Sequence, residues 1–138
     1  MRFKLWVAIL AAVLSPGPAL GAAEECPAKS AAMDDIIASI SDSPSCERAM
    51  KTFDACQFGS SGDVQFGDAV EKKCERDFLA ELKAPQKRAY QRRMRACDRK
   101  YRNQSGTMYL SFAAFCRAKV ARLYSQQALK AAATRPSR

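Results

Sequence analysis

Two blocks joined by a short polar turn decide the fold: PQKRAYQRRMRACDRKYR (85–102) and MYLSFAAFCRAKVARLYSQQAL (108–129). Apolar residues recur in both at helical spacing, and the first block opens on a proline, which favours the first turn of a helix. The turn between them, residues 103–106, is too short for anything but antiparallel neighbours. This arrangement puts Cys97 opposite Cys116 on the two apolar seams, and we predict a disulfide between them.

Each predicted seam contains one of these cysteines. The first seam consists of Tyr90, Met94, Cys97 and Tyr101. The second seam consists of Tyr109, Phe112, Ala113, Cys116, Val120 and Leu123. Both follow the three- and four-residue steps of a helix with one buried face.

Three further helices are predicted upstream, over residues 31–41, 44–57 and 69–83. Ser30 is the expected N-cap of the first, and Ser43 followed by Pro44 is expected to start the second. Asp68 with Glu71 three residues later has the form of a capping box for the third, after turn residues 59–63 and a polar linker to Gly67. No strand-like alternation occurs, so the predicted fold is an all-α bundle of about five helices.

The chain has six cysteines, and their number and setting predict three disulfides, so four cysteines remain to be paired after Cys97 and Cys116. No CxxC pair and no histidine is present, which argues against metal or redox chemistry. If the helix over 44–57 is continuous, its two cysteines lie roughly 15 Å apart and cannot bond to each other. Cys56 then pairs with Cys26, and Cys46 with Cys74. A break near Thr52 would instead allow Cys46–Cys56 and Cys26–Cys74.

The N-terminus has the order of a secretory signal peptide. Arg2 and Lys4 precede an apolar run from 5 to 14, helix-breaking residues 15–18 and small residues to Ala23. The run is too short to span a membrane, and no later stretch is longer. We predict cleavage after Ala23, or alternatively after Gly21, a single domain over 24–130 and a flexible tail over 131–138. Periplasmic or secreted localisation follows, where disulfides persist.

Charge is unevenly distributed along the chain. Residues 24–82 hold 13 carboxylates and 6 cations, whereas residues 83–138 hold 15 cations and only Asp98 as an anion. On the helix over 85–102, five arginines recur about 200° round from the apolar seam. This set, called the arginine face below, consists of Arg88, Arg92, Arg95, Arg99 and Arg102. It is a candidate anion-binding surface; the alternatives are a solvated face or one paired with the acidic half.

The residue types present in the chain argue against several classes of function. Without histidine the chain lacks the commonest general base and metal ligand, and Asp34–Asp35 and Asp77/Glu81 are typical of surface carboxylates. We predict no enzymatic activity, no cofactor and no metal. No aromatic stacking array accompanies the arginines, which argues against nucleic acid as a partner.

The second half resembles the LprI-type lysozyme-inhibitor-like family, which are small cysteine-containing helical domains of the bacterial envelope. The matching residues are Gln86, Arg93, Cys97, Gly106, Thr107, Cys116 and Arg122. The sequence departs from the pattern at Ala89, where the family has tryptophan, and at Met94, where it has an acidic residue. The resemblance covers about 40 residues and implies a divergent member or sister family.

Taken with the charge pattern, this resemblance leads to two expectations. The first is a non-enzymatic exported binding module whose partner is an envelope or extracellular macromolecule such as lysozyme. Since common animal lysozymes are basic, carboxylates such as Asp34, Asp35, Asp63 and Asp68 would have to make that contact. The second is a structural envelope protein that binds anionic glycan or lipopolysaccharide through the arginine face.

Overall fold

The computed structural model describes residues 24–135, which form five helices and no strand. The predicted signal peptide and residues 136–138 of the predicted tail lie outside the described residues. The helices are α1 (Met33–Ser41), α2 (Cys46–Cys56), α3 (Asp63–Glu75), α4 (Ala84–Tyr101) and α5 (Thr107–Ala133). The all-α prediction is confirmed.

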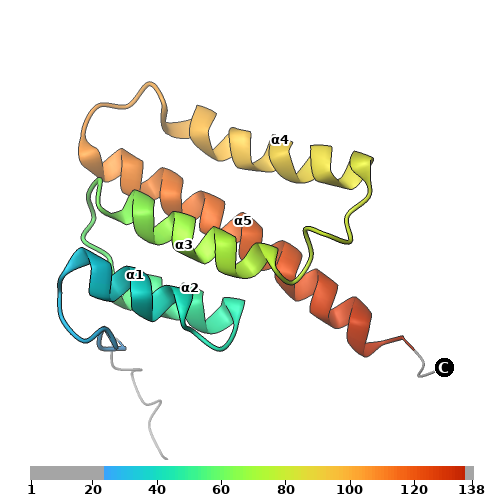
Figure 1. Ribbon diagram of the computed structural model, residues 1–138. Helices are drawn as coiled ribbons and strands as arrows, with labels where there is room; N and C mark the ends of the chain where they lie inside the picture. Colours follow the sequence, from blue (N-terminus) through green and yellow to red (C-terminus); the bar gives the residue numbers. More distant parts are fainter. Residues whose placement is uncertain (1–23, 136–138) are drawn as a thin grey trace, which may run out of the picture.

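The helices form three layers with α3 and α5 in the middle (Figure 1). The short helices α1 and α2 pack on one side of this pair, and α4 lies on the other side, antiparallel to α5. Among the described helices, α5 alone brings its backbone close to that of α4. α4 is therefore an outer element whose far side is free of any other helix.

One contiguous core joins all five helices. Its largest fully buried side chains are Phe53, Phe66, Ile36, Ile40, Met50 and Val70. Phe53 stacks on Phe115 of α5 with ring centroids 3.9 Å apart, and its edge faces Phe66 of α3. These aromatic contacts fix α2, α3 and α5 relative to one another.

All six cysteines are paired, and the pairing matches the first of the two sequence-based alternatives. Cys97 bonds to Cys116, as the hairpin argument predicted. Cys26 bonds to Cys56 and Cys46 to Cys74, because α2 is continuous and keeps its two cysteines at opposite ends. Three such disulfides fit an oxidising extracellular or periplasmic environment.

The predicted starts of the first two helices are wrong by two residues. Ala32 is the N-cap of α1, while Ser30 accepts a hydrogen bond from the Ala32 amide and donates to Asp35. Ser45, not Ser43, caps α2 by accepting from the Arg48 amide. A serine that satisfies another local group cannot also serve as the cap, which sequence alone does not reveal.

The prediction for α3 was wrong at both ends. The helix begins at Asp63, six residues before the predicted start, and ends at Glu75, before a run of turns to residue 81. Asp63 is fully buried and accepts from the amides of Phe58 and Gly59 and from the Ser111 hydroxyl of α5. These bonds fix the helix start, so the supposed capping box of Asp68 and Glu71 lies inside the helix.

The predicted buried seam of α5 was also wrong. The buried residues are small: Ser111, Ala114, Ala118, Ala121 and Ser125. Small side chains let α3 and α5 approach closely, and a Cβ added at Gly67 of α3 would lie 3.0 Å from the Ala114 Cβ. Of the large residues of the predicted seam, Phe112 and Leu123 are exposed, although Phe112 lies near Tyr101 of α4, and Val120 is half-buried against the core.

The C-terminal end of α5 projects beyond the other helices (Figure 1). The helix continues through Ala133, so the first three residues of the predicted tail are helical. No helix in the described part of the chain is long and apolar enough to cross a membrane.

Candidate anion-binding face

α4 is fixed on its inner side and at both ends. Pro85 lies in its first turn, and Gln86 Oε1 accepts a hydrogen bond from the Lys83 amide at 2.9 Å. Tyr90, Met94 and Cys97 are buried against α5, as the spacing predicted. The Cys97–Cys116 disulfide closes the hairpin with the two Cα atoms 5.6 Å apart. The orientation of α4 about its own axis is therefore fixed.

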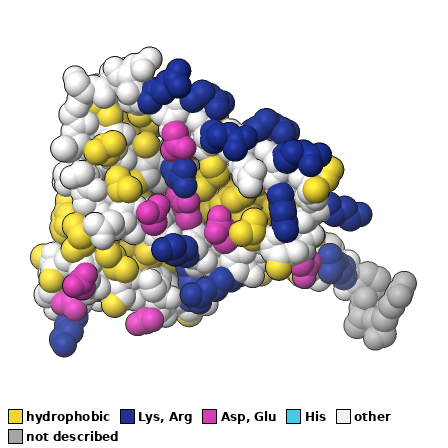
Figure 2. All heavy atoms as spheres, turned by 45° about the horizontal axis from the view of Figure 1, so that its top comes forward, with side chains coloured by type: hydrophobic (Ala, Val, Ile, Leu, Met, Phe, Trp, Pro, Cys, Tyr) yellow, Lys and Arg dark blue, Asp and Glu magenta, His cyan; other side chains and the backbone are white. Residues whose placement is uncertain are grey.

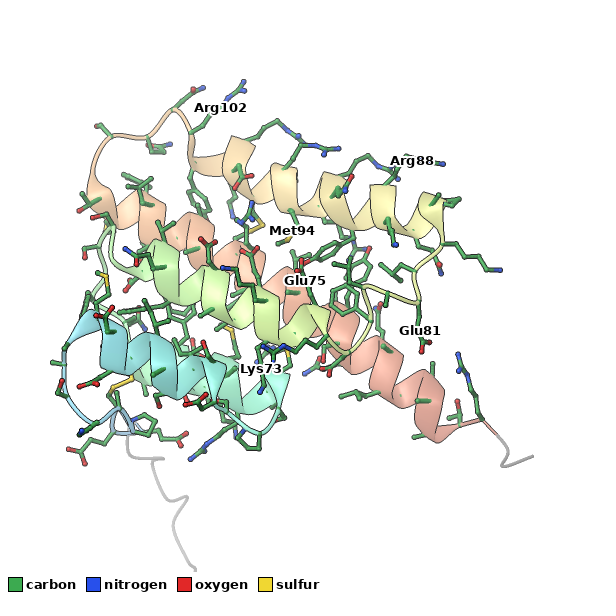
Figure 3. All side chains as sticks on the ribbon, in the orientation of Figure 1. Lys73, Glu75, Glu81, Arg88, Met94 and Arg102 are labelled. Carbon is green, nitrogen blue, oxygen red and sulfur yellow. A yellow bond between two sulfur atoms is a disulfide. The ribbon has the colours of Figure 1, made fainter. Side chains whose placement is uncertain are left out.

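With the inner side buried, the arginine face points outward. All five of its arginines are exposed. In Figure 3, Arg88 and Arg102 extend away from the bundle while Met94 points toward α5. Figure 2 shows basic side chains in a row along the α4 side of the molecule. From Arg88 to Arg102 the row is about 21 Å long at 1.5 Å per residue.

No arginine of this face forms an ion pair with any carboxylate between residues 24 and 135. The one acidic residue of α4, Asp98, points to the flank and pairs with Arg117 of α5 at 3.1 Å. The alternative in which the arginines pair with the acidic half of the domain is therefore contradicted. A solvated face and an anion-binding face remain.

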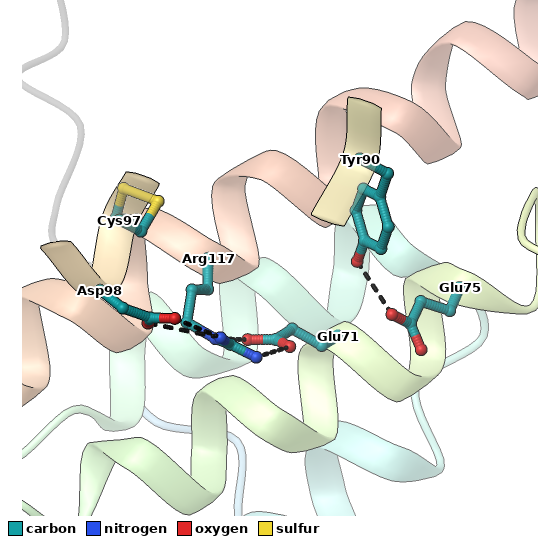
Figure 4. Close-up of polar contacts among 7 residues, drawn as sticks. Glu71, Glu75, Tyr90, Cys97, Asp98 and Arg117 are labelled. Carbon is teal, nitrogen blue, oxygen red and sulfur yellow. Dashed lines mark hydrogen bonds and ion pairs between the residues drawn. A yellow bond between two sulfur atoms is a disulfide. The ribbon is translucent and has the colours of Figure 1, made fainter. Parts of the chain in front are cut away.

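Arg117 links three helices through two carboxylates (Figure 4). Its Nε and Nη2 each donate to Glu71 of α3 at 2.8 Å, while Nη1 donates to Asp98 of α4. Burial raises the pKa of Glu71, and the hydrogen bonds and charge of Arg117 oppose that rise. The same hydrogen bonds raise the pKa of Arg117, which stays charged. This bridge holds α4 against the α3–α5 pair.

A second polar link lies nearer the start of α4. The Tyr90 hydroxyl donates to Glu75 Oε1 at 2.9 Å, and the Tyr90 ring packs against Phe78 and Tyr124. Burial raises the pKa of Tyr90, and the nearby charge of Glu75 raises it further. The tyrosine is therefore a neutral hydrogen-bond donor that positions α4, and no general base is created here.

The family-motif residues lie along the hairpin that contains this face. Gln86 and Arg93 line a hollow of about 370 Å³ together with Ala89, one of the two positions that depart from the resemblance. The Arg93 guanidinium lies 5.8 Å from the centre of the Tyr124 ring. Arg122 contacts Glu47 of α2 at 3.5 Å.

The Gly106–Thr107 pair marks the start of α5. Gly106 is the N-cap, with φ of +108°, a conformation that side chains disfavour, and Thr107 is the first helical residue. Gln86, Gly106 and Thr107 thus lie at the starts of the two hairpin helices, whereas Arg122 contacts α2.

The carboxylates considered as partner contacts have different surroundings. Asp34 and Asp68 are exposed and Asp35 is half-buried, but Asp63 is fully buried and unavailable to a partner. That candidate was wrong because Asp63 fixes the start of α3. Asp77 accepts from the buried Ser125 hydroxyl, and Glu81 lies 4.0 Å from Arg135, so these two do not form a carboxylate pair.

The Arg117 bridge was not predicted from the sequence, although the sequence contains a signal for it. Asp98 directly follows Cys97, and Arg117 directly follows Cys116. Once the disulfide is predicted, opposite charges one residue beyond each cysteine should meet across the hairpin. Between residues 24 and 135, no three potential ligands among His, Cys, Asp and Glu gather in a way that could hold a metal ion.

Comparison with known proteins does not assign the chain to a family. No protein-family model matches the sequence, and neither a curated protein nor a solved structure matches it significantly.

Proposed function

We propose that this chain is an exported, non-enzymatic binding module that holds an anionic polymer on the arginine face of α4. The observation that carries the proposal is a row of five exposed arginines with no ion-pair partner in the described chain. An anionic glycan or lipopolysaccharide would supply the missing negative charges.

Electrostatics within α4 supports the same proposal. Arg88 and Arg92, and likewise Arg95 and Arg99, are four residues apart, and like charges at this spacing destabilise a helix by roughly 0.2–0.5 kcal/mol per pair. A polymer with negative groups distributed over about 21 Å would remove this repulsion along the whole row. Such a ligand therefore binds the folded helix and stabilises it.

A second candidate is a lysozyme-inhibitor-like module. Two observations support it. The motif residues Gln86 and Arg93 line the same hollow, and the acidic residues Asp34 and Asp68 are exposed. A basic lysozyme would have to contact such carboxylates, because the arginine face repels it. The first candidate thus binds its partner through the arginine face, and the second through exposed carboxylates.

One variant separates the two candidates. Changing Arg88, Arg92, Arg95 and Arg99 together to glutamine should abolish binding to immobilised dextran sulfate and to lipopolysaccharide, while the free energy of unfolding rises slightly. Before mutation, binding should weaken steeply as salt concentration rises. For a lysozyme inhibitor, the same variant should inhibit as well as the unmodified protein or associate faster.

A charge-matched control keeps this test specific. Lys29, Lys51, Lys72 and Arg76 are exposed and lie outside α4. Their joint replacement by glutamine removes the same four charges and should leave polyanion binding within about twofold. Equal losses in both variants would show that net charge alone attracts the polymer. Retained binding in the arginine variant would eliminate the proposal.

A further inference from the structure

A hollow of about 450 Å³ lies between α2, α4 and α5, and no arginine of the arginine face lines it. Its lining residues are Asp54, Gln57, Lys100, Tyr101, Phe112, Phe115, Cys116 and Lys119. The volume is within the range of small-molecule sites, and residues from three helices converge on it. The hollow therefore has the size and the lining of a binding site separate from the arginine face.

The apolar part of the hollow is aromatic. Phe112 leaves 42% of its surface exposed, yet its ring contacts both Tyr101 and Tyr109, at centroid distances of 5.9 and 5.8 Å. Phe115 is stacked on the buried Phe53 and cannot turn away. These rings form a preorganised apolar surface. Its hydration is unfavourable, and a flat apolar group packs well against it.

Two ammonium groups accompany the rings, one from each helix of the hairpin. Lys100 Nζ lies 5.1 Å from the centre of the Tyr101 ring, and Lys119 Nζ lies 5.8 Å from the centre of the Phe115 ring. In the described part of the chain, no carboxylate comes within 4.0 Å of either nitrogen. Both charges thus lie beside the aromatic surface without forming an ion pair.

Asp54 is the one carboxylate of the lining. Burial raises its pKa, while the charges of Lys119 and Arg122 oppose the rise. A ligand anion beside Lys119 would experience repulsion from Asp54, so this residue limits affinity. The lining has two positive groups against one negative, and the balance favours an anion.

We propose that this hollow binds a small organic anion in which a flat apolar ring carries a carboxylate or sulfonate. The ring lies against Phe112 and Phe115, and the anionic group reaches the ammonium groups of Lys100 and Lys119. An inorganic anion leaves the aromatic surface uncovered, and a neutral aromatic compound leaves both charges unpaired, so each binds more weakly.

Naphthalene-2-sulfonate is a suitable probe, measured by isothermal titration calorimetry with amide chemical shifts to locate the site. We expect saturable binding with shifts at residues 54–57, 100–101 and 112–119. Naphthalene-2-methanol and inorganic sulfate should each bind at least about tenfold more weakly, since each lacks one half of the interaction. Shifts spread along α4, or no saturation at millimolar probe, would overturn the proposal.

Substitutions with opposite expected signs test the assignment of residues. Lys100→Gln with Lys119→Gln should weaken binding about tenfold or more, Phe112→Ala should weaken it, and Asp54→Asn should tighten it. Lys72→Gln with Lys130→Gln removes two exposed lysines outside the hollow and should change nothing. Circular dichroism confirms that each variant is folded. Unchanged affinity in the first variant, or loss of binding in the control, would contradict the proposed site.

Discussion

Replacing Arg117 by methionine should destabilise the protein by roughly 2–4 kcal/mol, because it leaves the buried carboxylate of Glu71 unpaired. The guanidinium makes two 2.8 Å bonds to Glu71, whose side chain is 9% exposed, and two longer bonds to the exposed Asp98. Arg117 itself is 30% exposed, so water reaches part of the vacated site and the loss stays below that of a fully buried pair.

The loss of stability in Arg117→Met should also depend on pH. Burial already raises the pKa of Glu71, and removing Arg117 raises it further. A carboxyl group with a raised pKa stabilises the fold most below its unfolded-state pKa, and this contribution is lost as pH rises through the folded-state pKa. The deficit of Arg117→Met relative to the unmodified protein should therefore be larger at pH 7 than near pH 4.

Urea unfolding followed by far-ultraviolet circular dichroism measures both effects. Adding Glu71→Gln to Arg117→Met removes the unpaired charge and should recover about half of the loss at pH 7. Arg92→Met, which removes an unpaired exposed arginine, should change stability by less than about 0.5 kcal/mol. If Arg117→Met costs under 1 kcal/mol at both pH values (on the order of a surface ion pair), the bridge does not fasten α4 as argued.

Two further predictions concern the close contact of α3 with α5. Gly67→Ala should destabilise by about 1–3 kcal/mol despite the better helix propensity of alanine, since the new Cβ would lie 3.0 Å from the Ala114 Cβ and 3.2 Å from the Ala114 carbonyl oxygen; adding Ala114→Gly removes only the first contact and should recover part of the loss in thermal melts. Asp63→Ala should cost about 3–5 kcal/mol in urea unfolding, because the Phe58 and Gly59 amides and the Ser111 hydroxyl all lose their acceptor. A cost below 1 kcal/mol (no more than one ordinary hydrogen bond) would show that water replaces the carboxylate.

The sequence predicted those parts of the fold that depend on local signals. Local signals were sufficient to predict α4 and its disulfide. These signals are Pro85, the short turn at 103–106 and the spacing of Tyr90, Met94 and Cys97. Signals that need a distant partner were misread. Asp63 lies buried at the start of α3, where it accepts from two nearby amides and also from the Ser111 hydroxyl, which is 48 residues away in the sequence.

The buried face of α5 illustrates a different limit. Periodicity selects the most apolar stripe as the core face, yet α5 contacts α2, α3 and α4 and therefore has more than one buried side. The closest neighbour, α3, faces the small residues, and the aromatic stripe falls beside α4 and the surface. Helix spacing predicted that the arginines share one face, but their lack of partners depends on where the carboxylates of the first half lie in space.

The Cys97–Cys116 disulfide should hold α4 in place more than it holds the whole domain together. It closes a loop of 19 residues, which corresponds to about 3 kcal/mol of restricted unfolded-state entropy. Replacing both cysteines by serine leaves the Cys26–Cys56 and Cys46–Cys74 bonds, which join α2 to the N-terminal segment and to α3. Of the described helices, only α5 brings its backbone close to that of α4. We therefore expect α4 to open separately from α1, α2 and α3.

Native-state hydrogen exchange distinguishes this local opening from a general loss of stability. In the Cys97→Ser, Cys116→Ser variant, protection of α4 amides should fall by about two orders of magnitude, as expected for about 3 kcal/mol, while α3 amides change far less. Polyanion binding should weaken in parallel, since the arginine face needs an ordered helix. An equal loss of protection in all five helices would instead mean that α4 unfolds only with the core, and the view of α4 as a separately attached outer helix would be wrong.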